Sequence, residues 1–285
     1  MGDKRVLNLG AGTQSSVLYL MMLRGEIPPA DVAIFADTQW EPAAVYANID
    51  WLKSQGNATI PIVKVTAGNL RADAIEFIQN RKSADGKRYA SMPLHVLNQN
   101  GSHGIINRQC TKEYKIEVIE RYIRRTVLGM APRQRVPKDT SVVQVFGISF
   151  DELWRMRTPN HKWVDFDYPL VDLRMRRQQV IEWGERHYPG HHFPRSACIG
   201  CPYRTNREWR EMRDHRPAEW ADAVQFDYTI RDRDRDRQRQ RATVHAMPFL
   251  HRSCVPLDKA NLDDDQGELK FGPPLGNECT GLCGV

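Results

Sequence analysis

The stretch RVLNLGAGTQSS, residues 5–16, decides the fold class of this chain. Arg5 to Leu9 has the apolar character of a short buried strand, and the turn Gly10-Ala11-Gly12 follows it directly. Apolar residues then recur with helical spacing from Val17 to Met22. A strand, a glycine-rich turn and a helix in this order are typical of the first unit of an α/β domain.

The rest of the N-terminal half repeats this alternation. Val32 to Ala36 and Ile60 to Val65 are further apolar runs, and a helical pattern from Ala43 to Gln55 lies between them. This order of strands and helices predicts a parallel sheet with helices on its faces, because parallel strands need crossover connections. Further along, the sequence predicts a strand at 141–146, helices at 115–125, 174–187 and 207–227, and a mobile loop over a ligand site at 81–107. We expect an α/β domain over 1–190 and a Cys-containing, Arg-rich helical extension with a flexible tail over 191–285.

Composition excludes several classes of protein. The chain has 285 residues, 41% hydrophobic and 27% charged, which is the balance of a folded protein. It lacks an apolar run of the ~18 residues that a membrane-spanning helix needs. Its N-terminus has no signal-peptide pattern, so we expect a cytoplasmic protein without a membrane partner. The net charge is +6, and the 30 arginines against 11 lysines favour a ligand or partner that carries phosphate. The alternating signs of 231–241 indicate an ordinary solvated surface.

The six cysteines are too few for a disulfide scaffold in a chain of this size and indicate metal or redox chemistry. Two thiolates in a CxxC spacing can bind one metal ion or two irons of a cluster. The cysteines comprise a CxxC pair, a CxxxC pair and two single residues: Cys198 and Cys201, Cys279 and Cys283, and Cys110 and Cys254. Cys254 is interpreted as a buried thiol and a reserve ligand, and the pair His191-His192 is given no functional role.

The turn at residues 10–16 has the composition of a phosphate-binding loop. Its glycines let backbone N–H groups approach an anion, its hydroxyls add donors, and the helix N-terminus adds partial positive charge. It is not a Walker A loop, since no Gly-Lys-Ser/Thr follows, and Ser15 stands where GxGxxG has its third glycine. The sequence therefore predicts phosphate or pyrophosphate binding without either motif.

Four segments, in matching order, resemble the phosphoadenosine phosphosulfate (PAPS) reductase-like branch of the PP-loop nucleotide-binding superfamily, which includes sulfonucleotide reductases and sulfur-transfer proteins of DNA phosphorothioation. The turn GAGTQSS is similar to that family's SGGxDS, and FADTQWEP at 35–42 is similar to its DTG segment. RQCT at 108–111 with Lys115-Ile116 resembles its R-x-CT-x(3)-KI element. Gly147 with Glu152 and Arg155 resembles its G-x-R-x(2)-ES-x(2)-R element, although the first arginine is missing.

The resemblance implies a parallel-sheet adenine nucleotide α-hydrolase-like (PP-loop) fold over 1–190. It further implies an adenine nucleotide, either ATP or a sulfonucleotide (PAPS or APS), across the carboxyl ends of the strands. The nucleotide-binding residues it implies are Gly10, Ala11, Gly12, Thr13, Gln14, Ser15, Ser16, Asp37, Arg108, Lys115, Gly147 and Arg155. Gln14 departs from the family pattern, because ATP-splitting members have a magnesium-binding Asp at this position and an amide is a poorer ligand. The departure favours a sulfonucleotide over ATP and leaves magnesium open.

The cysteines resemble those of iron–sulfur-bearing adenylyl-sulfate reductases. That resemblance implies a [4Fe-4S] cluster on Cys110, Cys198, Cys201 and, as the missing fourth ligand, Cys283. It also implies that a tail cysteine, Cys279 or Cys283, is the catalytic nucleophile. A structural zinc site on Cys198, Cys201, Cys279 and Cys283 is the alternative.

Three functions follow from this comparison. In the first, the protein reduces a sulfonucleotide with a thiol donor and releases sulfite. In the second, it is an ATP pyrophosphatase that adenylates a nucleic acid and transfers sulfur to it from a donor protein. In the third, it senses nucleotides without turnover. A homo-oligomer is compatible with all three.

Overall fold

The computed structural model describes residues 4–79, 92–231 and 246–263. Their contacts divide the chain into two compact units that interleave in sequence. Among the described residues, the first unit comprises 4–67 and 111–197, and the second comprises 68–79, 92–110, 198–231 and 246–263. Residues 68–79 and 92–110, which the sequence assigns to the α/β domain, therefore group with the C-terminal part of the chain.

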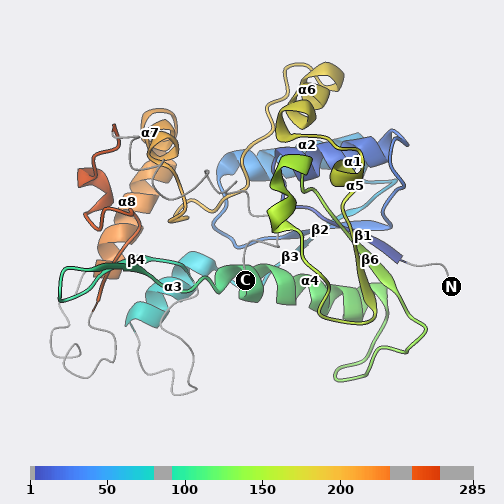
Figure 1. Cartoon of the computed structure of the whole chain (residues 1–285), viewed down its shortest axis with the longest axis horizontal. Coiled ribbons are helices and arrows are strands. Elements are labelled where there is room, and N and C mark those ends of the chain that lie inside the picture. Colours follow the sequence, from blue (N-terminus) through green and yellow to red (C-terminus); the bar gives the residue numbers. More distant parts are fainter. Residues whose placement is uncertain (1–3, 80–91, 232–245, 264–285) are drawn as a thin grey trace. The chain divides into compact units, whose positions relative to one another are not determined.

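The first unit contains a five-stranded sheet in which every strand pair is parallel (Figure 1). The strand order is β3-β2-β1-β6-β7. The strands are β1 (Lys4–Asn8), β2 (Val32–Ala36), β3 (Ile62–Val65), β6 (Val142–Phe146) and β7 (Val164–Asp167). This arrangement confirms the predicted α/β class with a parallel sheet, and it is compatible with a Rossmann-like fold.

Helices cover both faces of this sheet, because each strand points apolar residues to both sides. Leu7 and Phe35 face the cluster formed with α1 (Thr13–Leu23), α2 (Ala43–Gly56) and α6 (Arg177–His187). Val6 and Ile34 face the opposite cluster. That second cluster includes residues of a continuous helical stretch, made of Lys112–Ile116, α4 (Glu117–Tyr122) and Ile123–Val127. Short helical segments complete the unit: Phe150–Arg155 and α5 (Pro169–Asp172).

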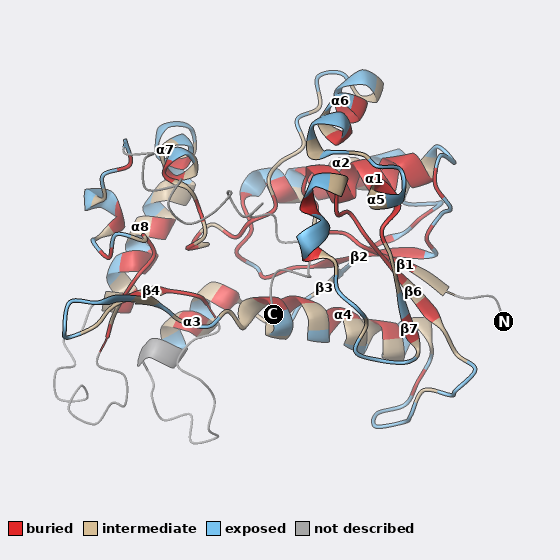
Figure 2. Cartoon of the chain, viewed as in Figure 1, coloured by how far each residue is buried: buried red, intermediate tan, exposed pale blue. Residues whose placement is uncertain are grey.

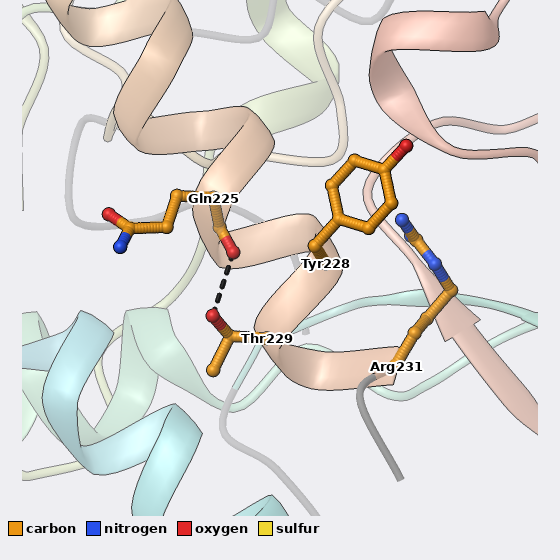
Figure 3. A pocket seen from close by; sticks show the side chains of 4 residues that line it. All are labelled: Gln225, Tyr228, Thr229 and Arg231. Carbon is orange, nitrogen blue, oxygen red and sulfur yellow. Dashed lines mark hydrogen bonds between the residues drawn. The ribbon is translucent and has the colours of Figure 1, made fainter.

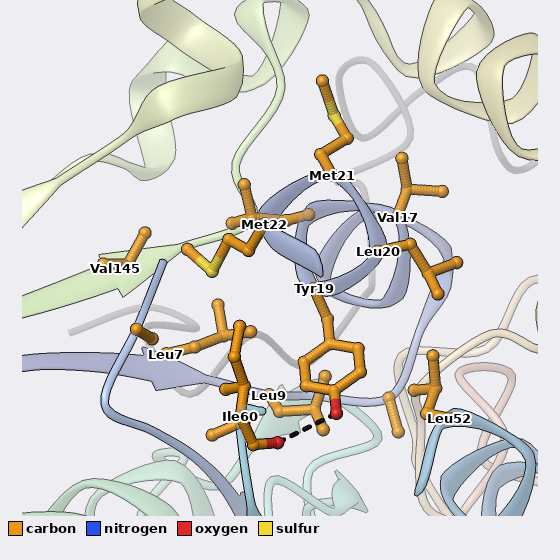
Figure 4. Packing of buried hydrophobic residues seen from close by; sticks show 14 of the residues in the cluster. Leu7, Leu9, Val17, Tyr19, Leu20, Met21, Met22, Leu52, Ile60 and Val145 are labelled. Atoms are coloured by element: carbon orange, nitrogen blue, oxygen red, sulfur yellow. Dashed lines mark hydrogen bonds between the residues drawn. The ribbon is translucent and has the colours of Figure 1, made fainter. Parts of the chain in front are cut away.

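Helix α1 is buried along nearly its whole length, as its colour in Figure 2 shows. Its side chains pack among Leu7, Leu52 and Ile60 (Figure 4). The one hydroxyl of this cluster drawn in Figure 4, that of Tyr19, donates a 2.9 Å hydrogen bond to the Ile60 carbonyl. Burial raises the pKa of Tyr19 to about 12, so this donor keeps its proton at neutral pH.

The order in which strands are added to the sheet reverses between β1 and β6. From β1 the chain continues outward to β2 and β3, and it then returns to place β6 on the other side of β1. The carboxyl ends of β1 and β6 therefore mark a topological switch point, which is where open α/β sheets bind ligands. The turn after β1 and the segment that begins with Gly147 lie there.

The described part of the second unit has a three-stranded antiparallel sheet, in the order β5-β4-β8, three α-helices and one short 3₁₀ helix. Its elements are α3 (Leu70–Gln79), β4 (His95–Leu97), β5 (His103–Ile105), α7 (Asn206–His215), α8 (Pro217–Arg231), β8 (Met247–Phe249) and the short helix Leu257–Lys259. Strands β4 and β5 correct the expectation of an irregular loop over their part of 81–107. Each has three residues, too few to show a period of two in the sequence. No helix in the described part of the chain is long and apolar enough to span a membrane.

We predict that Gly147→Ala destabilises the first unit. A Cβ at this position would lie 2.8 Å from the backbone nitrogen of Ser15 and 2.9 Å from its Cα. Backbone atoms cannot relieve such an overlap by rotating to another rotamer, as a side chain can. Overpacking of this kind costs about 2 kcal/mol of unfolding free energy. Urea unfolding followed by circular dichroism measures the loss. Gly25→Ala is the control, because its Cβ would meet nothing within 4 Å and only the positive φ of +75° is strained. Equal losses in the two variants would contradict the close contact.

Candidate functional site

The predicted phosphate-binding turn lies at the N-terminus of α1, with all its residues from Ala11 to Ser16 buried. Ala11 has a left-handed backbone, with φ of 56°, and Gly12 is extended at the N-cap. No side chain caps this end of the helix, and its first turn holds no acidic residue. The first N–H groups of a helix have no partner within it, so this buried end suits an anion.

Gln14 connects the turn to the segment that follows β6. Its Nε2 donates to Ser149 Oγ at 2.8 Å and to Glu152 Oε2 at 2.7 Å. Its Oε1 accepts from Arg177 Nη1 at 3.3 Å. Both ends of the amide are thus engaged by protein groups, two of which, Ser149 and Arg177, the sequence analysis did not identify. Ser149 follows β6, which lies beside β1 in the sheet, and Arg177 begins α6, which packs with α1 in one core cluster.

Arg155, predicted to neutralise phosphate, is buried in an ion pair. Its Nη1 lies 2.9 Å from Glu152 Oε2, and both side chains are nearly inaccessible to solvent. The carboxylate that accepts from Gln14 is therefore the same one that compensates Arg155. The ion pair lies within the helical segment after β6, and the hydrogen bond from Gln14 to Glu152 connects that segment with the N-terminus of α1.

Asp37 and Lys115 are the other two charged residues of the first unit that were predicted to bind the nucleotide, and they also have partners of opposite charge. Asp37 accepts from Tyr46 Oη at 2.8 Å and lies 3.4 Å from Lys64 Nζ. Burial, followed by the bond to Asp37, raises the pKa of the Tyr46 hydroxyl. Lys115 Nζ lies 3.6 Å from Glu41 Oε1, in a pair with almost no exposure. The predicted set in this unit is accordingly built around compensated charges.

The CxxC turn belongs to the second unit, and a buried arginine holds it. The Cys201 N–H donates to the Cys198 carbonyl at 3.1 Å. Arg204 donates to the carbonyls of Cys198 at 2.9 Å and Ile199 at 3.2 Å. Burial lowers the pKa of Arg204, while electrostatic attraction from the thiols of Cys201 and Cys198 opposes that shift.

Two residues from the 92–110 segment of the second unit also lie beside this turn. His95 Nε2 lies 3.3 Å from the Pro202 carbonyl, and burial lowers its pKa. The guanidinium of Arg108, predicted to bind phosphate, lies 5.1 Å from the ring centre of Tyr203, a cation–π contact. Arg108 is thus placed in the second unit, beside the CxxC turn, whereas the other predicted nucleotide-binding residues are in the first.

The described cysteines, Cys110, Cys198, Cys201 and Cys254, all belong to the second unit. Burial raises the pKa of Cys254. Within 4–79, 92–231 and 246–263, no three His, Cys, Asp or Glu side chains are arranged to hold a metal ion. Cys279 and Cys283 lie outside the described residues, so the predicted ligand set and tail nucleophile stay predictions.

A surface pocket of about 360 Å³ lies on α8, lined by Gln225, Tyr228, Thr229 and Arg231 (Figure 3). Three of the side chains that line the pocket bind neighbouring residues of the protein. Thr229 Oγ1 donates to the Gln225 carbonyl at 2.7 Å, and Tyr228 Oη donates to Asp258 at 2.9 Å. Arg231 is paired with Asp227. None of the predicted site residues lines this pocket, which we do not assign to the function.

Comparison of the chain with protein-family models, with curated proteins and with solved structures finds no match. The family resemblance described for the sequence therefore stays a prediction.

We predict strong coupling between Glu152 and Arg155. Glu152→Gln leaves a buried guanidinium without its carboxylate, and breaking one side of a buried pair costs about 3 kcal/mol of unfolding free energy. Arg155→Met removes the other partner, and the double variant leaves no uncompensated charge, so it should lose less than the sum of the single losses. Urea unfolding of the four proteins gives the coupling energy, expected to be about 1.5 kcal/mol or more. Additive losses would show that the pair does not stabilise the loop.

Proposed function

We propose that this chain is a PP-loop protein of the PAPS reductase-like family that reduces an adenine sulfonucleotide. The observation that carries the proposal is the buried, uncapped N-terminus of α1 at the switch point between β1 and β6. Free N–H groups and the helix dipole at such a position attract phosphate or sulfate oxygens. The turn that holds them is also the segment whose sequence resembles the family loop.

The contacts of Gln14 support a sulfonucleotide over ATP. A magnesium–ATP site needs carboxylate oxygens near the phosphates. Here the family's Asp is replaced by an amide whose oxygen accepts from Arg177 and whose nitrogen donates to Ser149 and Glu152. The nearby Glu152 carboxylate is compensated by Arg155. We therefore propose binding that needs no magnesium.

The reaction requires a thiolate nucleophile and an external reductant. A tail thiolate, of Cys279 or Cys283, attacks the sulfur of the sulfonucleotide, and the sulfur–oxygen bond to the nucleotide phosphate breaks with its electron pair on oxygen. The products are a cysteine thiosulfonate and the free nucleotide. A dithiol donor, such as a small redox protein, then attacks the cysteine side of the thiosulfonate and releases sulfite. Its second thiol resolves the resulting mixed disulfide, so the donor is oxidised and the tail thiolate is restored.

The thiols of the second unit are donors of the type that an iron–sulfur centre uses, although the described side chains are not arranged around a metal. Cys110, Cys198 and Cys201 would hold it, with Cys283 as the predicted fourth ligand and Cys254 as the alternative within the same unit. Arg204 would compensate the negative charge of a thiolate-bound centre. When bound, such a centre would supply cross-links between the segments that carry these cysteines. Zinc on thiolates is the competing assignment.

The first test separates the three functions by their products. The purified chain with a dithiol reductant is expected to release sulfite from PAPS or APS, equally with EDTA and with magnesium. Pyrophosphate release from ATP, stimulated by DNA or RNA, would replace the proposal with nucleic-acid sulfur transfer. Tight nucleotide binding without either product would select the sensing role. Cys279→Ser and Cys283→Ser, compared with Cys254→Ser, show whether a tail thiol is the nucleophile.

The second test addresses the metal. Protein purified without oxygen is expected to contain iron and acid-labile sulfide and to absorb broadly in the visible range. Cys198→Ala removes one of the paired thiolates and should abolish both the iron and the colour. Comparing the iron content of Cys283→Ala with that of Cys254→Ala identifies the fourth ligand. Colour that survives Cys198→Ala would overturn the ligand assignment, and zinc in place of iron would establish the structural alternative.

A further inference from the structure

One buried amide joins the phosphate-binding turn to the helix that follows β2. Asn48, on α2, is 2% exposed. Its Nδ2 donates to the Ala11 carbonyl at 3.1 Å and to Ser16 Oγ at 2.9 Å. These two acceptors stand on either side of the N-cap of α1, so a single side chain connects the residue before the helix with its first turn.

The donors and acceptors of this contact leave one arrangement. A backbone carbonyl can only accept, so the NH₂ group of Asn48 must face Ala11. Its Oδ1 then faces His191, whose Nε2 lies 2.9 Å away and must carry the proton. His191 thereby fixes which way the amide points. Protonation of the ring would not break this bond, because Nε2 donates in the neutral and in the charged form.

Aromatic packing holds His191 in place. Its ring stacks on Trp51, with centroids 3.6 Å apart and planes at 13°, and meets Phe193 edge-on at 4.7 Å. Trp51 lies three positions after Asn48 on α2, and Tyr188 packs against its edge at 5.4 Å. All these residues belong to the first unit. The segment around 188–193 is thus anchored to α2 where Asn48 supports the turn.

The turn needs support because Ala11 is strained. A residue with a Cβ is unfavourable at a φ of 56°, and nothing in the residue type itself holds it there. A hydrogen bond to its carbonyl fixes the orientation of the peptide that leads into Gly12. That peptide determines where the first N–H groups of α1 point.

We infer that Asn48, oriented by His191, is a positioning residue that holds the phosphate-binding turn in its ligand-ready shape. This inference rests on the proposed nucleotide-binding function. Neither residue contacts the ligand directly in this scheme. They act through Ala11 and Ser16 on the N–H groups that do.

The test uses nearly isosteric changes in the full chain. Asn48→Asp replaces the donor that faces the Ala11 carbonyl with an acceptor. His191→Phe keeps a ring on Trp51 but removes the N–H that orients the amide. Two measurements are made: amide hydrogen exchange over residues 16–19, where the hydrogen bonds of α1 begin, and calorimetric titration with ATP and with adenosine 3′,5′-bisphosphate. Both variants should exchange faster over 16–19 and bind each nucleotide about tenfold more weakly or worse. In Asn48→Asp the Ala11 carbonyl loses its hydrogen-bond donor, and in His191→Phe the side-chain oxygen of Asn48 loses its donor.

His187→Phe is the matched control. His187 also stacks on a tryptophan, Trp183, and bonds to a backbone carbonyl, but it does not contact Asn48. It should change neither measurement, whereas His191→Gln, which keeps an N–H donor, should recover part of the loss seen in His191→Phe. Unchanged exchange over 16–19 in Asn48→Asp and in His191→Phe would overturn the inference, whatever binds. Faster exchange in a chain whose parent binds neither nucleotide would support the positioning role and refute the proposed function.

Discussion

Gly147 and the backbone of Ser15 are in such close contact that the two loops at the carboxyl edge of the sheet form one structure. A single added carbon would overlap main-chain atoms of the first turn of α1. The hydrogen bonds of Gln14 to Ser149 and Glu152 join the same two segments. The shape of the candidate anion site therefore follows from the packing of β1 beside β6.

Charge compensation limits what can bind a ligand at this edge. Arg155 and Lys115 are each paired with a buried carboxylate, and Asp37 is held by a tyrosine and a lysine. Such pairs are costly to break, so they fix the positions of loops more readily than they bind phosphate. In the proposed function, backbone N–H groups at the N-terminus of α1 would then provide the principal attraction for phosphate, and the geometry of Ala11 and Gly12 would matter more than the number of arginines.

The second unit contains a different set of functional side chains. The described thiols, the buried His251 and the buried Arg204 all belong to it. His251 illustrates how dry this region is, because burial lowers its pKa to about 4, with help from Arg252 and His95. Its neutral ring bonds to Asn206 at 3.0 Å, a contact that connects the segment of Cys254 with α7. A thiolate-bound centre would add to the cross-links already present there.

The sequence by itself determined the local elements. Apolar runs and a glycine turn defined β1, β2 and the helices α1, α2 and α6 to within a few residues, because periodicity and turn chemistry are local properties. The same signals predicted chemistry at Gly10 to Ser16 and at the CxxC turn, and these assignments stay predictions. Strands β4 and β5 were missed because three residues are too few to show a period. The grouping of 68–79 and 92–110 with the C-terminal part has no local signal in the sequence. Only the tertiary structure decided which groups meet: Gln14 bonds to a residue 138 positions away, and Asn48 to one 143 positions away. Those partners are chosen by the order of strands in the sheet, and the hydrophobic pattern that builds each strand does not encode that order.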